Sequence, residues 1–274
     1  MNITIGFSPC PNDTFMFDAL IHKKIDTGGI TFVPVIEDVQ ELNLRCLAHE
    51  LDVSKISYHA FSKVYKDYAM CTSGSALGKG VGPLLISKKE YTIDQLSQLS
   101  VAIPGIHTTA AFLLEYAFPK IHEKHEMIFH EIESAILSGT VDTGVIIHEN
   151  RFTYEQRGLH KILDLGTYWE EKTKLPIPLG GICINRNNDP KLQSTVNRLL
   201  RESVEYAFAH PDSSKDYVRQ YAQEMEAEIV NKHISTYVNP YSLDIGKEGK
   251  KAVLRMFQEI FGKKVEEDDI FVTN

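Results

Sequence analysis

Short apolar runs alternate with segments of helical spacing over the first two thirds of the chain. Apolar runs bounded by glycine, proline or polar residues are typical of buried strands. Such runs predict strands at residues 3–7, 30–36, 52–57, 68–71, 82–87, 100–103, 126–129, 142–148 and 176–185. Segments between them repeat apolar residues at helical spacing, as in Phe15/Ala19 and Met16/Leu20. This alternation predicts an α/β fold.

The last third of the sequence is predicted to be mostly helical. We expect helices at residues 189–209, 213–225, 229–238 and 247–261. The charged end, residues 263–274, is expected to be loosely ordered. The single tryptophan, Trp169, is expected to begin a short charged helix before the last strand.

Two strand–helix blocks are separated by extended segments at residues 82–87 and 180–184. The simplest architecture has two lobes, each a three-layer α/β structure, joined by these two strands as a hinge. Lobe one would contain residues 1–88 and 180–274, and lobe two residues 89–179. A chain of 274 residues is long enough to form two such cores.

Composition and charge exclude several classes of protein. Hydrophobic residues make up 43% and charged residues 24%, as in an ordinary globular protein. The net charge of -8 argues against nucleic acid as a partner, because a phosphate-binding surface needs a basic stripe. No apolar run is long enough to cross a bilayer, so no membrane association is predicted. No signal-peptide pattern precedes the first strand, and we expect a cytoplasmic protein.

The cysteines and histidines do not form metal-binding patterns. Cys10, Cys46, Cys71 and Cys183 are far apart and include no C-x-x-C, so we expect buried free thiols. Cys10 could be a nucleophile at a helix start, although no partner base is close in sequence. The histidines between residues 122 and 130 lack the spacing of metal ligands, so no metal site is predicted.

A buried strand leads directly into His148 and Glu149. Ligands of open α/β sheets bind at the carboxyl ends of the strands. Imidazole can take or give a proton near neutral pH, so we predict that His148 is a general base. The alternative is that His148 only caps the following turn. His107, which precedes another predicted helix, is the rival base.

Polar residues mark three predicted helix starts, at Asn12–Thr14, Ser57–Tyr58 and Thr108–Ala110. The first turn of a helix has unpaired N–H groups and a positive dipole, which together attract anions. Lys55 lies two residues before Ser57, on the same face of its strand. We expect both lobes to present these groups to a shared cleft that binds a small carboxylate. Plain helix capping is the alternative at each start.

Several blocks, in order along nearly the whole chain, resemble 1,4-dihydroxy-6-naphthoate synthase, a family of the futalosine pathway of menaquinone biosynthesis. The blocks are SPCPNDTFMF at residues 8–17, KISY at 55–58, SALGKGVGPL at 75–84, PGIHTTA at 104–110, IIHENRFTY at 146–154 and YVN at 237–239. The resemblance implies a type II periplasmic-binding-protein-like fold, in agreement with two lobes.

The resemblance also implies a reaction. Cyclic dehypoxanthine futalosine would be cleaved to 1,4-dihydroxy-6-naphthoate, releasing a dihydroxyacetone-type fragment, with no metal or organic cofactor. His148 matches the family's proton acceptor. The predicted substrate-binding residues are Lys55, Ile56, Ser57, Thr109 and Ala110 from the resemblance, with Asn12 and Thr108 from their places at helix starts.

Three other functions are compatible with the same fold, one of them an effector-sensing module. A binding protein for small carboxylates would use a similar site but would need no base. The chorismate-dehydrating enzyme of the same pathway shares the fold, although the Ser8–Asp13 block favours the synthase.

Overall fold

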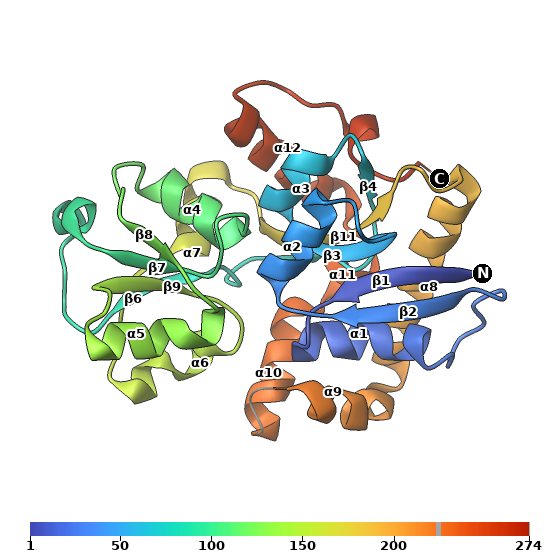
Figure 1. Ribbon diagram of the computed structural model, residues 1–274, viewed down its shortest axis with the longest axis horizontal. Helices are drawn as coiled ribbons and strands as arrows, with labels where there is room; N and C mark the ends of the chain where they lie inside the picture. The colour runs from blue at the N-terminus through green and yellow to red at the C-terminus, as the bar shows by residue number, and fades with distance from the viewer. Residues whose placement is uncertain (223–225, 274) are drawn as a thin grey trace. The chain divides into compact units, whose positions relative to one another are not determined.

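The computed structural model describes residues 1–222 and 226–273 (Figure 1). The chain forms two compact units, residues 1–78 with 178–274 (unit 1) and residues 79–177 (unit 2). Each unit is an α/β structure with its own sheet.

Unit 1 contains a mixed sheet in the order β2-β1-β3-β11-β4, with β5 paired to β11. Its strands are β1 (Asn2–Phe7), β2 (Thr31–Ile36), β3 (Val53–Ser57), β4 (Tyr68–Met70), β5 (Ala76–Gly78) and β11 (Ile177–Asn185). Strand β1 is parallel to β2 and β3, whereas β11 is antiparallel to β3 and β4. The carboxyl ends of β1 and β3 therefore lie at the same edge.

Helices cover both faces of this sheet (Figure 1). Ile3, Ile5 and Phe7 of β1 form a core with α1 and α8, and the intervening Gly6 faces Leu42 of α2. Most of the sheet is covered by α1 (Pro11–Ile21), α2 (Val39–Leu47), α3 (Tyr58–Val64), α8 (Pro190–Ala209) and α12 (Gly246–Phe261). The remaining helical segments of unit 1 are η4 (Pro211–Ser214), α9 (Lys215–Tyr221), α10 (Ala227–Tyr237), α11 (Pro240–Leu243) and η5 (Glu267–Asp269).

Unit 2 contains a five-stranded mixed sheet in the order β10-β6-β9-β7-β8. Its strands are β6 (Leu84–Ser87), β7 (Val101–Ile103), β8 (Lys124–Glu126), β9 (Thr143–Ile146) and β10 (His160–Asp164). Strand β7 is parallel to β8 and β9, whereas β6 is antiparallel to β9 and β10. The carboxyl ends of β7 and β9 therefore share one edge.

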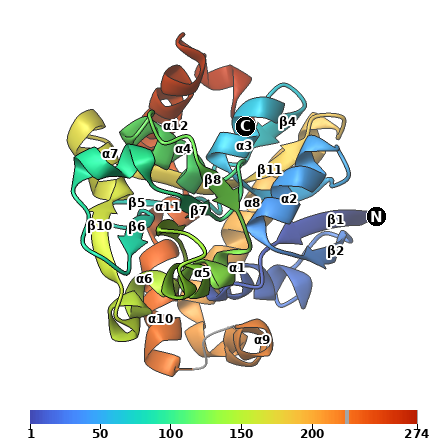
Figure 2. The same cartoon turned by 60° about the vertical axis from the view of Figure 1, so that its left-hand side comes forward.

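Figure 2 shows the helices of unit 2 on the two faces of its sheet. The helical segments are η1 (Ile93–Gln98), α4 (Thr109–Ala117), η2 (Phe129–Glu131), α5 (Ile132–Ser138), α6 (Asn150–Thr153), η3 (Tyr154–Arg157) and α7 (Leu165–Thr173). Trp169 lies in the middle of α7 and is fully buried against Phe112 and Tyr116. The prediction that Trp169 begins a helix was wrong, because Asp164 caps α7 by accepting a hydrogen bond from the Thr167 amide.

The places where the chain passes between units differ from the predicted ones. The units change after residue 78 and after residue 177, whereas the sequence suggested residues 88 and 179. Strand β6 lies within the sheet of unit 2, because it pairs with β9 and β10. Strand β11 likewise belongs to the sheet of unit 1. The two predicted hinge strands are thus each an ordinary member of one sheet.

The prediction of a loosely ordered C-terminal end was also wrong. Ile270, Phe271 and Val272 are buried in unit 1. The Met70 amide donates to the Ile270 carbonyl at 2.8 Å, and the Val272 amide donates to the Met70 carbonyl at 2.9 Å. These apolar residues extend the sheet beside β4, and the charged residues of the segment precede them in the sequence. Residues 223–225, which belong to the predicted helix at residues 213–225, and residue 274 lie outside the described residues.

Within the described ranges, none of the helices is both long enough and apolar enough to cross a membrane. The four cysteines are buried and carry no disulfide, as predicted.

Substituting Gly82 by alanine is expected to destabilise the protein by about 1–3 kcal/mol, as overpacking does. A Cβ at residue 82 would lie 2.3 Å from the Cα of Gly166, and a backbone atom cannot rotate out of the way. Thermal unfolding of Gly82→Ala measures this cost. The exposed Ser97→Ala variant is the control and should change the free energy of unfolding by less than about 0.5 kcal/mol. Equal stability of the two variants would contradict the close approach.

Candidate functional site

The first group of candidate residues lies at one edge of the unit 1 sheet. Strand β1 ends at Phe7 and leads through Ser8 into α1, and β3 carries Lys55 and ends at Ser57. Because β1 and β3 are parallel neighbours, both segments meet at the same edge. The topology thus brings together two segments that are far apart in sequence.

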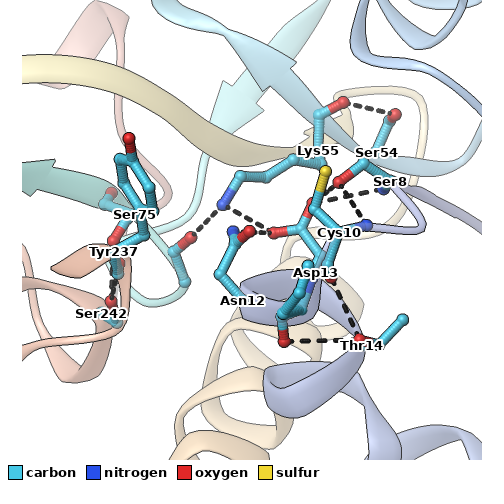
Figure 3. A network of polar contacts seen from close by, with 12 residues as sticks. Ser8, Cys10, Asn12, Asp13, Thr14, Ser54, Lys55, Ser75, Tyr237 and Ser242 are labelled. Atoms are coloured by element: carbon cyan, nitrogen blue, oxygen red, sulfur yellow. Dashed lines mark hydrogen bonds and ion pairs between the residues drawn. The ribbon is translucent and has the colours of Figure 1, made fainter. Parts of the chain in front are cut away.

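A buried carboxylate, that of Asp13, organises this edge (Figure 3). Its Oδ2 accepts hydrogen bonds from the Ser8 amide at 3.2 Å and the Ser8 hydroxyl at 2.7 Å. Its Oδ1 accepts one from Asn12 Nδ2 at 2.8 Å and lies 3.3 Å from Lys55 Nζ. An ionised carboxylate offers about four acceptor positions. Three of them accept hydrogen bonds, and the Lys55 ammonium faces the carboxylate in an ion pair.

The Lys55 side chain is only 6% exposed and is held by one hydrogen bond and one ion pair. The ion pair is with Asp13, and the hydrogen bond is to the Gly74 carbonyl, 3.0 Å from Nζ. Gly74 has a φ of +83°, and a Cβ there would lie 2.1 Å from Cδ1 of Ile182, so the position requires glycine. An ammonium group has three N–H donors. No acceptor from the described part of the chain takes the third.

Ser57 points from β3 to the same face as Lys55, whereas Ile56 points to the opposite face and is fully buried. The buried Asn43 of α2 accepts from the Ser57 amide at 2.9 Å and donates Nδ2 to its hydroxyl oxygen at 3.1 Å. The Ser57 hydroxyl makes no capping hydrogen bond to α3. Its own hydrogen has no acceptor in residues 1–222 and 226–273 and can be donated to a ligand.

Asn12 and Asp13 do not cap α1, contrary to one of the readings of the sequence. The helix begins at Pro11, so Cys10 occupies the N-cap position and both polar residues lie in the first turn. The Asn12 side chain is 6% exposed and has a partner at each end, Asp13 and Nε2 of His233. Cys10 is buried at 6% exposure. Direct contact of Asn12 with substrate stays a prediction.

The second group of candidates lies at one edge of the unit 2 sheet. The segment after β7 leads into α4, and the segment after the parallel neighbour β9 carries His148. Thr108 is the N-cap of α4, the alternative that the sequence left open, because its hydroxyl accepts from the Ala111 amide at 3.2 Å. Thr109 and Ala110 form the first turn, and the first helical hydrogen bond begins only at the Phe112 amide. This end of α4 therefore carries the positive helix dipole.

His148 follows β9 by two residues and has a φ of +57°, in the left-handed region. Its partly exposed ring packs on the edge of Phe129, with the ring centroids 4.9 Å apart and the planes at 68°. A left-handed conformation is unusual for a residue other than glycine and often marks a functional position. His107 is also partly exposed and lies in the segment before α4, at the same edge. The geometry therefore leaves both His148 and His107 as candidates for the general base.

A buried carboxyl group, that of Glu133, lies beside the segment that follows His148. Glu133 of α5 is fully buried, and one of its oxygens lies 2.7 Å from Nη1 of Arg157. Burial raises the pKa of Glu133, while the charge of Arg157 and the side chain of Asn150 oppose the rise. Asn150 begins α6 two residues after His148. The buried Glu133 side chain therefore lies close to the start of the helix that follows the imidazole.

The sequence did not identify Asn43, Gly74, Glu133 or His233 as parts of these two groups. Each acts across a long sequence separation, such as the 221 residues between His233 and Asn12. The one local signal is a polar residue within an otherwise apolar helical pattern, which Asn43 and His233 show. Such a residue requires a buried hydrogen-bond partner, but the sequence pattern does not identify that partner.

Two pockets within single units lie away from both groups. One in unit 1, of about 660 Å³, is lined mainly by residues of α9 and α10, and one in unit 2, of about 700 Å³, lies beside β10. Neither is lined by a predicted site residue. In the described ranges, no three His, Cys, Asp or Glu side chains gather as a metal site would require.

Relatives and solved structures resemble nearly the whole chain. Two relatives are described as 1,4-dihydroxy-6-naphthoate synthase. The one from Thermus thermophilus is 44% identical over 257 residues, covering 94% of this chain and 93% of the relative. The one from Streptomyces coelicolor is 39% identical over 257 residues, covering 92% of this chain and 90% of the relative.

The solved structures confirm the predicted fold. A crystal structure of an Archaeoglobus fulgidus protein matches with a TM-score of 0.89 and 34% identity, covering 95% of this chain and 98% of that one. The periplasmic aliphatic sulphonate binding protein of Escherichia coli matches with a TM-score of 0.67 and 11% identity, covering 99% of this chain and 92% of that one. At that identity the likeness shows only a shared type II periplasmic-binding-protein-like fold.

The family model described as menaquinone biosynthesis matches residues 3–261. That range includes every predicted site residue, from Asn12 to His148, and agrees with the resemblance seen in the sequence blocks. The chain therefore belongs to the menaquinone-biosynthesis family that includes the 1,4-dihydroxy-6-naphthoate synthases.

Proposed function

We propose that this protein is a carbon–carbon lyase that converts cyclic dehypoxanthine futalosine to 1,4-dihydroxy-6-naphthoate and releases a dihydroxyacetone-type fragment. The observation that carries the proposal is the position of His148. Its partly exposed imidazole follows β9, at the carboxyl-end edge of the sheet, where ligands of α/β proteins bind. The chain is also 44% identical to a relative described as this synthase.

Lys55 and Ser57 are proposed to bind oxygens of the substrate, which is a bicyclic carboxylic acid joined to a sugar-derived ring. Lys55 has one N–H, and Ser57 one O–H, without an acceptor in the described chain. The two side chains share one face of β3. A charged donor beside a neutral one suits a carboxylate or an adjacent pair of oxygens.

His148 is proposed to act as the general base. A neutral imidazole takes a hydroxyl or carbon-bound proton from the substrate, and the carbon–carbon bond to the sugar-derived ring then breaks. Formation of the aromatic naphthoate makes the cleavage favourable. Thr109 and Ala110, at the positive end of α4, are proposed to hold a substrate oxygen.

Incubation of the purified protein with cyclic dehypoxanthine futalosine is expected to yield 1,4-dihydroxy-6-naphthoate, detected by absorbance and mass. Chorismate, tested in parallel, is expected to remain unchanged. Tight binding without turnover would instead support a carboxylate-binding protein, and dehydration of chorismate would support the sister enzyme.

The variant His148→Asn is expected to lower kcat by about 10²- to 10⁴-fold, the usual contribution of a general base. Asparagine is the preferred substitution because it tolerates the left-handed backbone at this position better than alanine does. KM should stay within about threefold of the original value if binding relies on other groups. The exposed His160→Asn variant in the same unit serves as the control. An unchanged kcat in His148→Asn would show that His148 is not the base, and His107 would then be the candidate.

The variant Lys55→Gln is expected to raise KM about ten- to a hundredfold, because it removes a charged hydrogen-bond donor. Ser57→Ala removes a neutral donor and should raise KM about three- to tenfold. Steady-state kinetics measures both effects, with the exposed Lys63→Gln variant as the control. Unchanged KM values in both variants would show that this face of β3 does not bind substrate.

A further inference from the structure

We propose that Asn12 and His233 form a positioning pair that keeps the third N–H of Lys55 available for an anionic oxygen of the substrate. Neither side chain is assigned a reacting role, and His233 comes from α10, in the last part of the chain. The proposal rests on the substrate-binding role of Lys55 proposed above.

The orientation of the Asn12 amide follows from its neighbours. Oδ1 of Asp13 lies 2.8 Å from Nδ2 of Asn12, and an ionised carboxylate can only accept hydrogen bonds. The amide nitrogen therefore faces Asp13, and the amide oxygen faces Nε2 of His233 at 2.8 Å. That oxygen can only accept, so Nε2 of His233 must carry a proton. Hydrogen bonds are thus donated from His233 to Asn12 and from Asn12 to Asp13; Figure 3 shows the Asn12–Asp13 part.

This series of hydrogen bonds limits how many N–H groups of Lys55 can face Asp13. Ser8 fills both positions on Oδ2, and Asn12 fills one of the two on Oδ1. One position remains, and the Lys55 ammonium faces it in an ion pair, with Nζ 3.3 Å from Oδ1. Without Asn12, a second ammonium N–H could turn to the carboxylate, because a charge-assisted hydrogen bond is stronger than a neutral one. Asn12 therefore limits Asp13 to a single Lys55 donor.

His233 holds the Asn12 amide in the orientation that this limit requires. Its ring is fully buried, and its centroid lies 4.8 Å from that of Tyr237, one helical turn further along α10. A buried amide oxygen without a donor is costly, so an Asn12 side chain that lost its His233 donor would turn to find another. The position of the Lys55 ammonium then depends on a residue at the opposite end of the chain.

Two substitutions of similar size separate the hydrogen bond from simple packing. Glutamine at residue 233 can place an N–H where Nε2 stands, whereas asparagine is too short to reach Asn12. We expect His233→Asn to raise KM about three- to tenfold, with kcat changed less than twofold, and His233→Gln to restore KM to within about twofold. Equal KM values in the two variants would overturn the proposal.

A double-mutant cycle tests whether the effect passes through Lys55. In the Lys55→Gln background, His233→Asn should raise KM no further, because the ammonium that it positions is absent. The same fold increase in both backgrounds would show that His233 acts independently of Lys55. Thermal unfolding of each variant verifies that the folded protein is being compared.

Nitrogen NMR of the protein labelled with ¹⁵N-histidine and ¹⁵N-lysine gives a readout that needs no substrate. We expect a proton on Nε2 of His233, and a Lys55 Nζ signal that shifts in His233→Asn but not in His233→Gln. A His233 ring protonated only on Nδ1 would overturn the inference. Failure of the wild-type protein to turn over cyclic dehypoxanthine futalosine would instead refute the proposed function, and these signals would still test the positioning pair.

Discussion

The ion pair between Asp13 and Lys55 is the interaction on which the candidate site of unit 1 depends. Both groups are almost fully buried, at 2% and 6% exposure, and burying a charge is unfavourable unless hydrogen bonds satisfy it. Hydrogen bonds and the ion pair satisfy the buried carboxylate of Asp13. One N–H of the Lys55 ammonium has no acceptor in the described chain. Removing one partner of such a buried pair typically costs about 3–5 kcal/mol. The pair is therefore both a structural requirement and the source of a directed positive charge.

The two units place their candidate residues by the same topological rule. In unit 1, the parallel neighbours β1 and β3 end at the edge that carries Asp13, Lys55 and Ser57. In unit 2, the parallel neighbours β7 and β9 end at the edge that carries Thr108 and His148. Antiparallel strands complete each sheet without changing these edges. The sheets fix the positions of the segments, and buried polar contacts then fix the side chains.

Much of this arrangement could be predicted from sequence, because it depends on local patterns. Alternating strands and helices predicted the α/β class, and capping by Thr108 was one of two interpretations of its place before an apolar helix. Other features depend on contacts between distant residues. The burial of Phe271 depends on pairing beside Met70, and the orientation of Asn12 depends on His233. Trp169 was misplaced because Asp164, five residues earlier, is the residue that caps its helix.

A crystal structure of the His148→Asn variant with cyclic dehypoxanthine futalosine bound would show whether Lys55 holds the substrate. The third N–H of Lys55, which has no acceptor in the described chain, should donate to an oxygen of the ligand. We expect a ligand oxygen within about 3.2 Å of Lys55 Nζ, while Nζ keeps its contacts with Asp13 and the Gly74 carbonyl. A ligand bound away from Lys55, or a Lys55 that has left Asp13 to reach it, would contradict the account.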